Sequence, residues 1–143
     1  MTALERLVVF TFDFFENNET LVRLTRAENT LAGRYVRHSR MIEAMSTPLI
    51  DAINGLLRRG LVEGVFREEI DALQLYVSIV TLSAHHISNR RILSVAFGQD
   101  LGDPEWTAAR RGHAISLVRA YVLKPASSVI TEQPSPVSKR SLQ

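Results

Sequence analysis

The stretch DALQLYVSIVTLSAHHISN, residues 71–89, combines helical spacing with an almost complete lack of charge. After Asp71 it has no Asp, Glu, Lys or Arg before Arg90. A helix on a protein surface carries charged residues on its solvent side. The stretch therefore predicts a helix that is covered on every side, partly by its own domain and partly by a second subunit or a ligand.

Two faces are expected on this helix. At about 100° per residue, its uncharged polar residues fall on one narrow stripe: Gln74, Ser78, Thr81, His85 and Ser88. Apolar residues fill the remaining wide arc. Because an unpaired buried polar group costs about 1–3 kcal/mol, the stripe needs a partner if it is covered.

The ends of this helix are marked in the sequence. Asp71 is a favourable N-cap, and Gln74 follows three residues later as in a capping box. The polar residues 88–91 are expected to bend or end the helix. An apolar pattern then resumes at Ile92 and continues to Gly98, which is a suitable C-terminal stop.

Length and composition indicate one folded domain. The chain has 143 residues, of which 45% are hydrophobic, and a mean hydropathy of +0.01. No segment is apolar enough to predict a membrane span. Cysteine is absent, which excludes disulfides and thiol catalysis. Charged residues near the N-terminus argue against a signal peptide, so the expected compartment is the cytoplasm.

The net charge of +2 is concentrated at the C-terminus. Residues 124–143 hold Lys124, Lys139 and Arg140 against Glu132, so the rest of the chain sums to zero. This segment is rich in proline and serine and lacks apolar periodicity, which predicts a disordered tail. Because duplex binding needs a basic surface, residues 1–123 are expected to form a domain that does not bind DNA by itself.

Four further helical regions complete the expected all-α bundle. The first starts at a Thr2–Glu5 capping box; a strand, suggested by alternating phenylalanines at positions 10, 12 and 14, is the alternative. The others are residues 19–31, residues 39–60 and residues 104–123. The region of residues 39–60 is expected to be interrupted near Pro48, which suits a first helical position, and to end at Gly60.

The last helix, like residues 71–89, has apolar surface on more than one face. Small residues at positions 108, 112 and 116 would let another helix approach closely. We therefore expect the last two helices to form a four-helix interface in a homodimer. The candidate interface residues are Gln74, Ser78, Thr81, His85, Gly112, Ile115, Val118 and Val122.

Several blocks of sequence carry a family resemblance: LLRRG at residues 56–60, EGVFR at 63–67, QLY at 74–76, SNR at 88–90 and FGQDL at 97–101. Together with the helical order, they resemble the C-terminal regulatory domain of TetR-type (tetracycline-repressor) transcription factors. The resemblance implies a dimerising, ligand-sensing domain. Such regulators carry a helix-turn-helix domain before this region, so the chain is expected to be a fragment or a shortened product.

The resemblance also implies a ligand cavity among the middle helices, beside the long helix. The residues expected to line it are Phe14, Leu24, Glu28, Met41, Tyr76, His86, Asn89 and Trp106. This mixture suits a small, mostly apolar effector with one or two polar groups. A phosphorylated metabolite would require several converging arginines or lysines. Alternatively, the same residues complete a solid core, with His85 and His86 as hydrogen-bonded structural residues.

Catalysis is not expected, because the spacing assembles no nucleophile–base pair, phosphate loop, metal motif or cofactor site. Two other functions stay open. One is a stand-alone helical dimer that acts by protein–protein interaction. The other is a compact DNA-binding protein, which would use the arginines at positions 23, 26, 34, 37 and 40 around a turn at Gly33.

Overall fold

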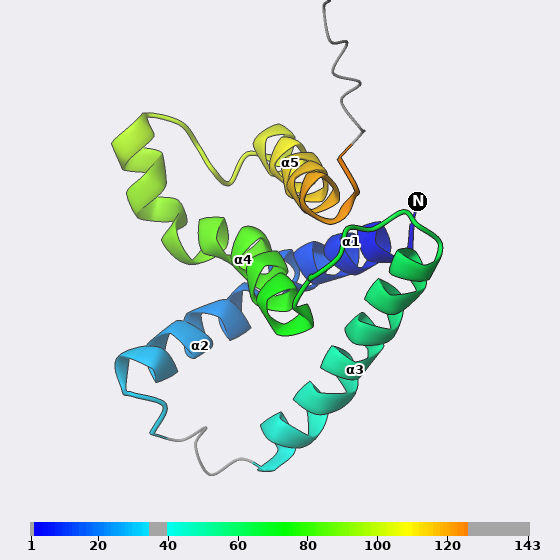
Figure 1. The fold of residues 1–143 in the computed structure, drawn as a ribbon. Helices are drawn as coiled ribbons and strands as arrows, with labels where there is room; N and C mark the ends of the chain where they lie inside the picture. Colours follow the sequence, from blue (N-terminus) through cyan, green and yellow to red (C-terminus); the bar gives the residue numbers. More distant parts are fainter. Residues whose placement is uncertain (1, 35–39, 126–143) are drawn as a thin grey trace, which may run out of the picture.

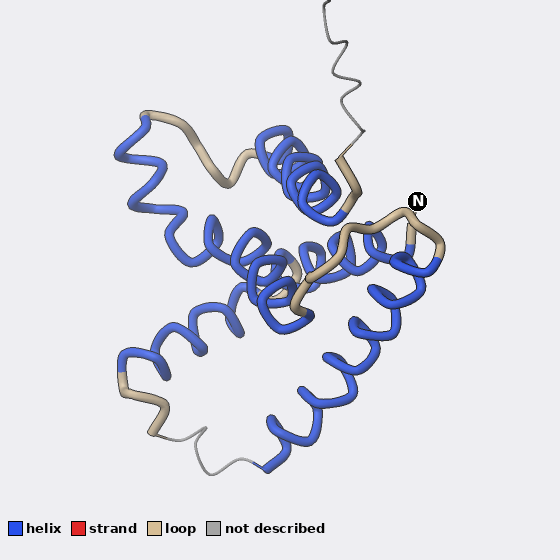
Figure 2. The backbone as a smooth tube through the Cα atoms, viewed as in Figure 1, coloured by secondary structure: helices blue, strands red, loops and turns tan. Residues whose placement is uncertain are grey.

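The computed structural model describes residues 2–34 and 40–125, with side chains described at all of these positions except 40–46. These residues form α1 (Ala3–Glu16), α2 (Glu19–Thr30), α3 (Arg40–Val62), α4 (Ala72–Phe97) and α5 (Pro104–Val122) (Figure 1). Across the described ranges, helices and loops account for the backbone (Figure 2), apart from an isolated antiparallel bridge between Phe66 and Leu123. The all-α prediction is confirmed.

The helix ends follow the capping residues of the sequence. Thr2 and Glu5 form a reciprocal capping box at α1, so the alternative strand at the phenylalanines was wrong. The Asp71 side chain accepts a hydrogen bond from the backbone N–H of Gln74 at 2.7 Å. At the other end of α4, Gly98 adopts a left-handed conformation with φ of 63°. Asp103 caps α5 by accepting from two backbone N–H groups.

Helix α3 corrects two expectations. It runs without interruption from Arg40 to Val62, with Pro48 inside it. Proline lacks a backbone N–H, but its fixed φ is helical, and Ile53 and Leu57 anchor the following turns in the core. The helix also continues two residues beyond Gly60, the expected end. Arg37 and the side chain of Arg40, considered above for DNA binding, lie outside the described residues, as does the predicted tail from residue 126 onward.

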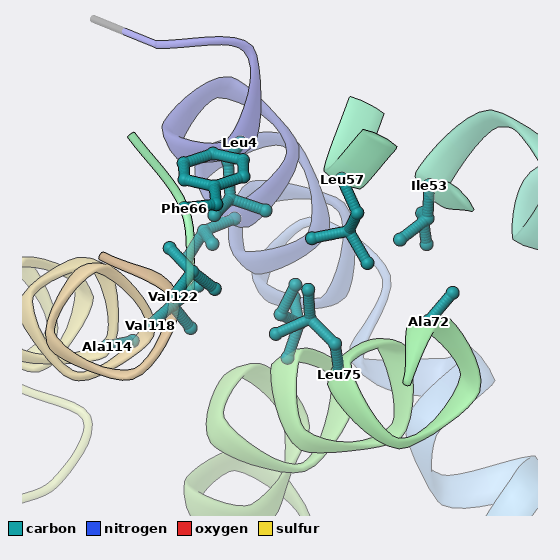
Figure 3. Close-up of a cluster of buried hydrophobic side chains, with 11 residues drawn as sticks. Leu4, Ile53, Leu57, Phe66, Ala72, Leu75, Ala114, Val118 and Val122 are labelled. Atoms are coloured by element: carbon teal, nitrogen blue, oxygen red, sulfur yellow. The ribbon is translucent and has the colours of Figure 1, made fainter. Parts of the chain in front are cut away.

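Helix α4 is the centre of the fold and packs against all four other helices. Figure 1 shows it crossing α1, with its last turns bending away from its first turns. Residues 88–91, which predicted a bend or an end, do not end the helix, because α4 continues to Phe97. The core lies at the other end of α4 (Figure 3) and consists of Leu4, Val8, Ile53, Leu57, Phe66, Ala72, Leu75, Ile79, Ala114, Val118 and Val122.

The link between α3 and α4 is fastened to the end of α5. The backbone N–H of Arg67 donates to the carbonyl of Val122 at 2.9 Å, and that of Lys124 donates to Val65 at 3.1 Å. Phe66 is buried beside Gly60, where any side-chain carbon would overlap the phenylalanine ring. The EGVFR motif is therefore a structural clip that joins three helices.

Candidate functional site

His86 is a buried core residue, with 2% of its surface exposed. Its Nε2 lies 2.6 Å from Oε1 of Glu16. The ring stacks on Phe12 with centroids 5.1 Å apart and lies 5.6 Å from the Trp106 ring. Helices α1, α4 and α5 therefore meet at this histidine, and its contacts are those of a structural residue.

The pKa of His86 lies below its ordinary value of 6.5. Burial is the largest cause, because it disfavours the charged imidazolium, and Glu16 only partly offsets it. A neutral ring can still donate its Nε2 proton to Glu16. Its Nδ1 is buried and has no hydrogen-bond partner among the described residues.

A chain of charged side chains extends from Glu16 toward α2. Arg90 lies between two carboxylates, with Nη1 2.5 Å from Oε1 of Glu19 and Nη2 3.6 Å from Oε2 of Glu16. Glu19 also pairs with Arg23 at 3.0 Å. Arg26 donates to the backbone carbonyl of Ser88. These polar contacts hold α2 to the second half of α4, where α2 contributes only Val22 to the buried residues.

A groove of about 350 Å³ lies between α2 and α4. Its apolar wall is formed by Phe15, Val22, Val80 and Ala84. Its polar side chains are Thr25, Arg26, Asn29, Thr81, His85, Ser88 and Asn89. This volume and mixed lining are typical of a site for a small, mostly apolar molecule.

A second cavity, of about 520 Å³, adjoins this groove. Its lining residues are Glu19, Arg23, Arg26, Ile87, Ser88, Asn89, Arg90, Arg91 and Ile92. Arg26, Ser88 and Asn89 line both cavities, so the two cavities share part of their walls. We call the second one the arginine cavity.

The residues expected to bind a ligand do not gather in one cavity. The rings of buried His86 and partly exposed Trp106 contact each other, and Asn89 lines both cavities. Tyr76 packs partly buried against the hydrophobic core. Phe14 and Leu24 are exposed, Glu28 is partly exposed, and the Met41 side chain lies outside the described residues.

The arginine cavity was not anticipated from the sequence. Arg23 and Arg26 are separated along the chain from Arg90 and Arg91 by α3 and half of α4. In the sequence, the arginines at 23 and 26 indicate only a basic stripe together with those at 34, 37 and 40. A pairing of α2 with the SNRR segment would have been needed to find the cavity, and no local pattern encodes that pairing.

The expected dimer-interface residues divide into two groups. On α4, Gln74, Ser78, Thr81 and His85 are exposed, as is Gly112 on α5, whereas Ile115 is half-buried. Val118 and Val122, which were also predicted for the interface, are only 4% and 1% exposed. They face the core of their own protomer, because α5 packs this side against α1. The exposed side of α5 instead carries Ala109, Gly112, Ser116 and Ala120.

Two further observations concern the described residues alone. In these ranges, histidines and acidic side chains do not form a group of three or more that could hold a metal ion. Nor does any described helix have the length and apolar character needed to cross a membrane.

Comparison with known proteins identifies the family. Residues 1–118 match the family described as "Tetracyclin repressor-like, C-terminal domain". The chain is also similar to the HTH-type transcriptional repressor NicS of Pseudomonas putida (strain KT2440), with 29% identity over 103 residues. That alignment covers 72% of this chain and 49% of the relative, so the chain spans about half the length of the relative. This chain belongs to the tetracycline repressor-like C-terminal domain family of transcriptional regulators.

Proposed function

We propose that this chain is the dimerising, ligand-sensing domain of a TetR-type regulator, and that it responds to a small, mostly apolar effector. Its family membership supports the regulatory role, and the name of the similar repressor supports an action on transcription. One observation carries the proposal. Thr81 and His85 belong both to the wall of the α2–α4 groove and to the exposed stripe expected to contact a second subunit.

The proposed dimer uses the outer faces of α4 and α5. The α4 face carries no charge from Ala72 to Asn89, and exposes Leu73 and Val77 beside the polar stripe. The α5 face is lined by the small residues named above, which permit a close helix approach. Two helices from each subunit would form a four-helix seam that buries on the order of 1,200–2,000 Å² in total.

The proposed effector occupies the groove between α2 and α4. Phe15, Val22 and Val80 would contact its apolar body, and Thr25 or Asn89 would bind a polar group. The few polar contacts fix orientation, while the apolar wall supplies most of the affinity.

Signal transfer in this proposal is a population shift. A ligand that contacts Thr81 and His85 binds one position of α4 better than another, and so changes the preferred arrangement of the subunits. In a longer regulator, that arrangement would set the spacing of the two DNA-binding units. The arginine contacts that hold α2 to α4 are polar and partly exposed, so this end can adjust more easily than the core.

Sedimentation velocity at micromolar concentration tests the dimer. The unmodified chain is expected to sediment as a dimer, and Ser78→Asp as a monomer, because the seam would have to bury an unpaired charge. Asn54→Asp is the matched control, since it adds the same charge to an exposed position on α3. A monomeric unmodified chain would contradict the proposal.

A thermal-shift screen with flat aromatic compounds, including the neutral probe 1-naphthamide, tests the groove. Compounds that fill it are expected to raise the melting temperature of the unmodified chain. Ala84→Phe should abolish this increase because its side chain fills the groove. Ala52→Phe, at an exposed position on α3, is the control. A screen without any stabilising compound would count against the proposed effector site.

A further inference from the structure

The arginine cavity differs from the groove beside it in its charge. Four arginines and a single acidic residue, Glu19, line it. Arg23 and Arg90 are already paired with carboxylates. Neither Arg26 nor Arg91 forms an ion pair in the described part of the chain. Two positive charges therefore remain without a carboxylate partner in one cavity.

Local charge contrasts with the charge of the chain as a whole. Residues 1–123 sum to zero, yet the fold concentrates arginines from two helices at this cavity. Like charges held close together repel each other, and an anion between them removes that repulsion. Guanidinium groups also bind carboxylates and phosphates in a bidentate geometry, which strengthens such contacts.

The walls of the cavity favour an organic anion. Ile87 and Ile92 lie among the arginines. The arginine cavity and the α2–α4 groove share Arg26, Ser88 and Asn89 in their walls, so the two lie side by side. A ligand with a flat apolar body in the groove would thus place a group at one end of that body among the arginines.

We propose that this site recognises an organic anion, whose carboxylate or phosphate group binds in the arginine cavity while its apolar body lies in the α2–α4 groove. The inference rests on the proposed ligand-sensing function and names the class of effector. Arg91 and Arg26 are the main anion-binding residues. Arg23 and Arg90, held in place by Glu19, complete the positive wall.

Isothermal titration calorimetry with three probes of one shape tests this assignment: 1-naphthoate, 1-naphthyl phosphate and neutral 1-naphthamide. At low salt, the better of the two anions is expected to bind at least about tenfold more tightly than the amide, because charge-assisted hydrogen bonds are the stronger ones. Raising the NaCl concentration should weaken the binding of the anions and leave the binding of the amide unchanged. The anion that binds more tightly identifies the head group.

Arg91→Gln is the most informative variant, because Arg91 is exposed and its loss does not disturb a buried contact. It should weaken binding of the preferred anion about tenfold and leave the amide unchanged. The affinity of Arg91→Lys for the anion should lie between that of Arg91→Gln and that of the unmodified chain, since lysine keeps the charge without the bidentate geometry. Arg6→Gln, which removes an exposed charge from the N-terminal half of α1, is the matched control and should bind like the unmodified chain.

Three results would overturn the inference. These are an amide that binds as tightly as both anions, an Arg91→Gln variant that binds like Arg6→Gln, and inorganic phosphate that binds as tightly as naphthyl phosphate. If the anions fail but the amide binds and raises the melting temperature, the anion inference is wrong and the apolar effector proposal stands. If all three probes fail, the effector proposal loses its support as well.

Discussion

The two halves of α4 lie in contrasting surroundings. One face of the first half is buried by apolar side chains from α1, α3 and α5, with Leu75 and Ile79 at the centre. The second half is held to α2 chiefly by hydrogen bonds and ion pairs, and it borders both cavities. A single helix therefore joins a rigid, close-packed region to a region with room for a ligand. Close packing resists small displacements, whereas polar surface contacts can rearrange at low cost.

The sharpest test of this contrast is Ile79→Ala, which removes a fully buried side chain from the packed half. We expect a loss of about 3 kcal/mol in the free energy of unfolding, from lost burial and the cavity left behind. Val77→Ala, at a half-exposed position two residues earlier, should cost less than about 1 kcal/mol. Urea denaturation of both variants measures the difference, and equal losses would refute the assigned packing.

Gly60→Ala tests the clip that closes the packed half. The new methyl group would overlap the Phe66 ring, and such overpacking costs about 1–3 kcal/mol. Gly55→Ala is a matched control in the same helix, because its nearest neighbour is a flexible arginine end 3.7 Å away. There alanine should stabilise the helix by about 0.5–1 kcal/mol. Chemical denaturation should show that the two substitutions change the free energy of unfolding in opposite directions. If both variants were more stable than the unmodified chain, the clip would be contradicted.

His86, between the two halves, should give the stability a pH dependence. Its pKa is lowered in the folded state, chiefly by burial, so the unfolded chain takes up more protons near and below pH 6.5. Stability should therefore be complete above that pH and fall as the pH decreases through it. Denaturation midpoints between pH 5.5 and 7.5 measure this slope. His86→Gln should reduce it, whereas His113→Gln, at an exposed position on α5, should leave it unchanged.

The smallest effect is expected on the polar side. Arg23→Gln breaks the exposed i, i+4 pair with Glu19 and should cost less than about 0.5 kcal/mol. Thermal unfolding compared with Arg6→Gln would detect the change. A loss of more than about 2 kcal/mol would show that ion pairs, like the apolar core, contribute strongly to stability, and would remove the contrast between the two halves of α4.

Capping residues explain why the helices were predicted well. The cap at Asp71, the capping box at Thr2 and the stop at Gly98 act through bonds to residues a few positions away. Pro48 misled the prediction because a local signal for a helix start was overridden by the packing of later turns. Two predicted ligand residues, buried His86 and partly exposed Trp106, contact each other through their rings, a packing that no local pattern indicated.

The sequence alone determined the helical class, most helix ends and a charge-free surface on α4, since each depends on neighbours within about one or two helical turns. Tertiary structure decided which face of each helix is buried. It placed Val118 and Val122 in the core and left the small residues of α5 exposed. It also brought Arg23 and Arg26 to Arg90 and Arg91. Such pairings depend on how whole helices cross, and that is set by the summed burial of many side chains distant in sequence.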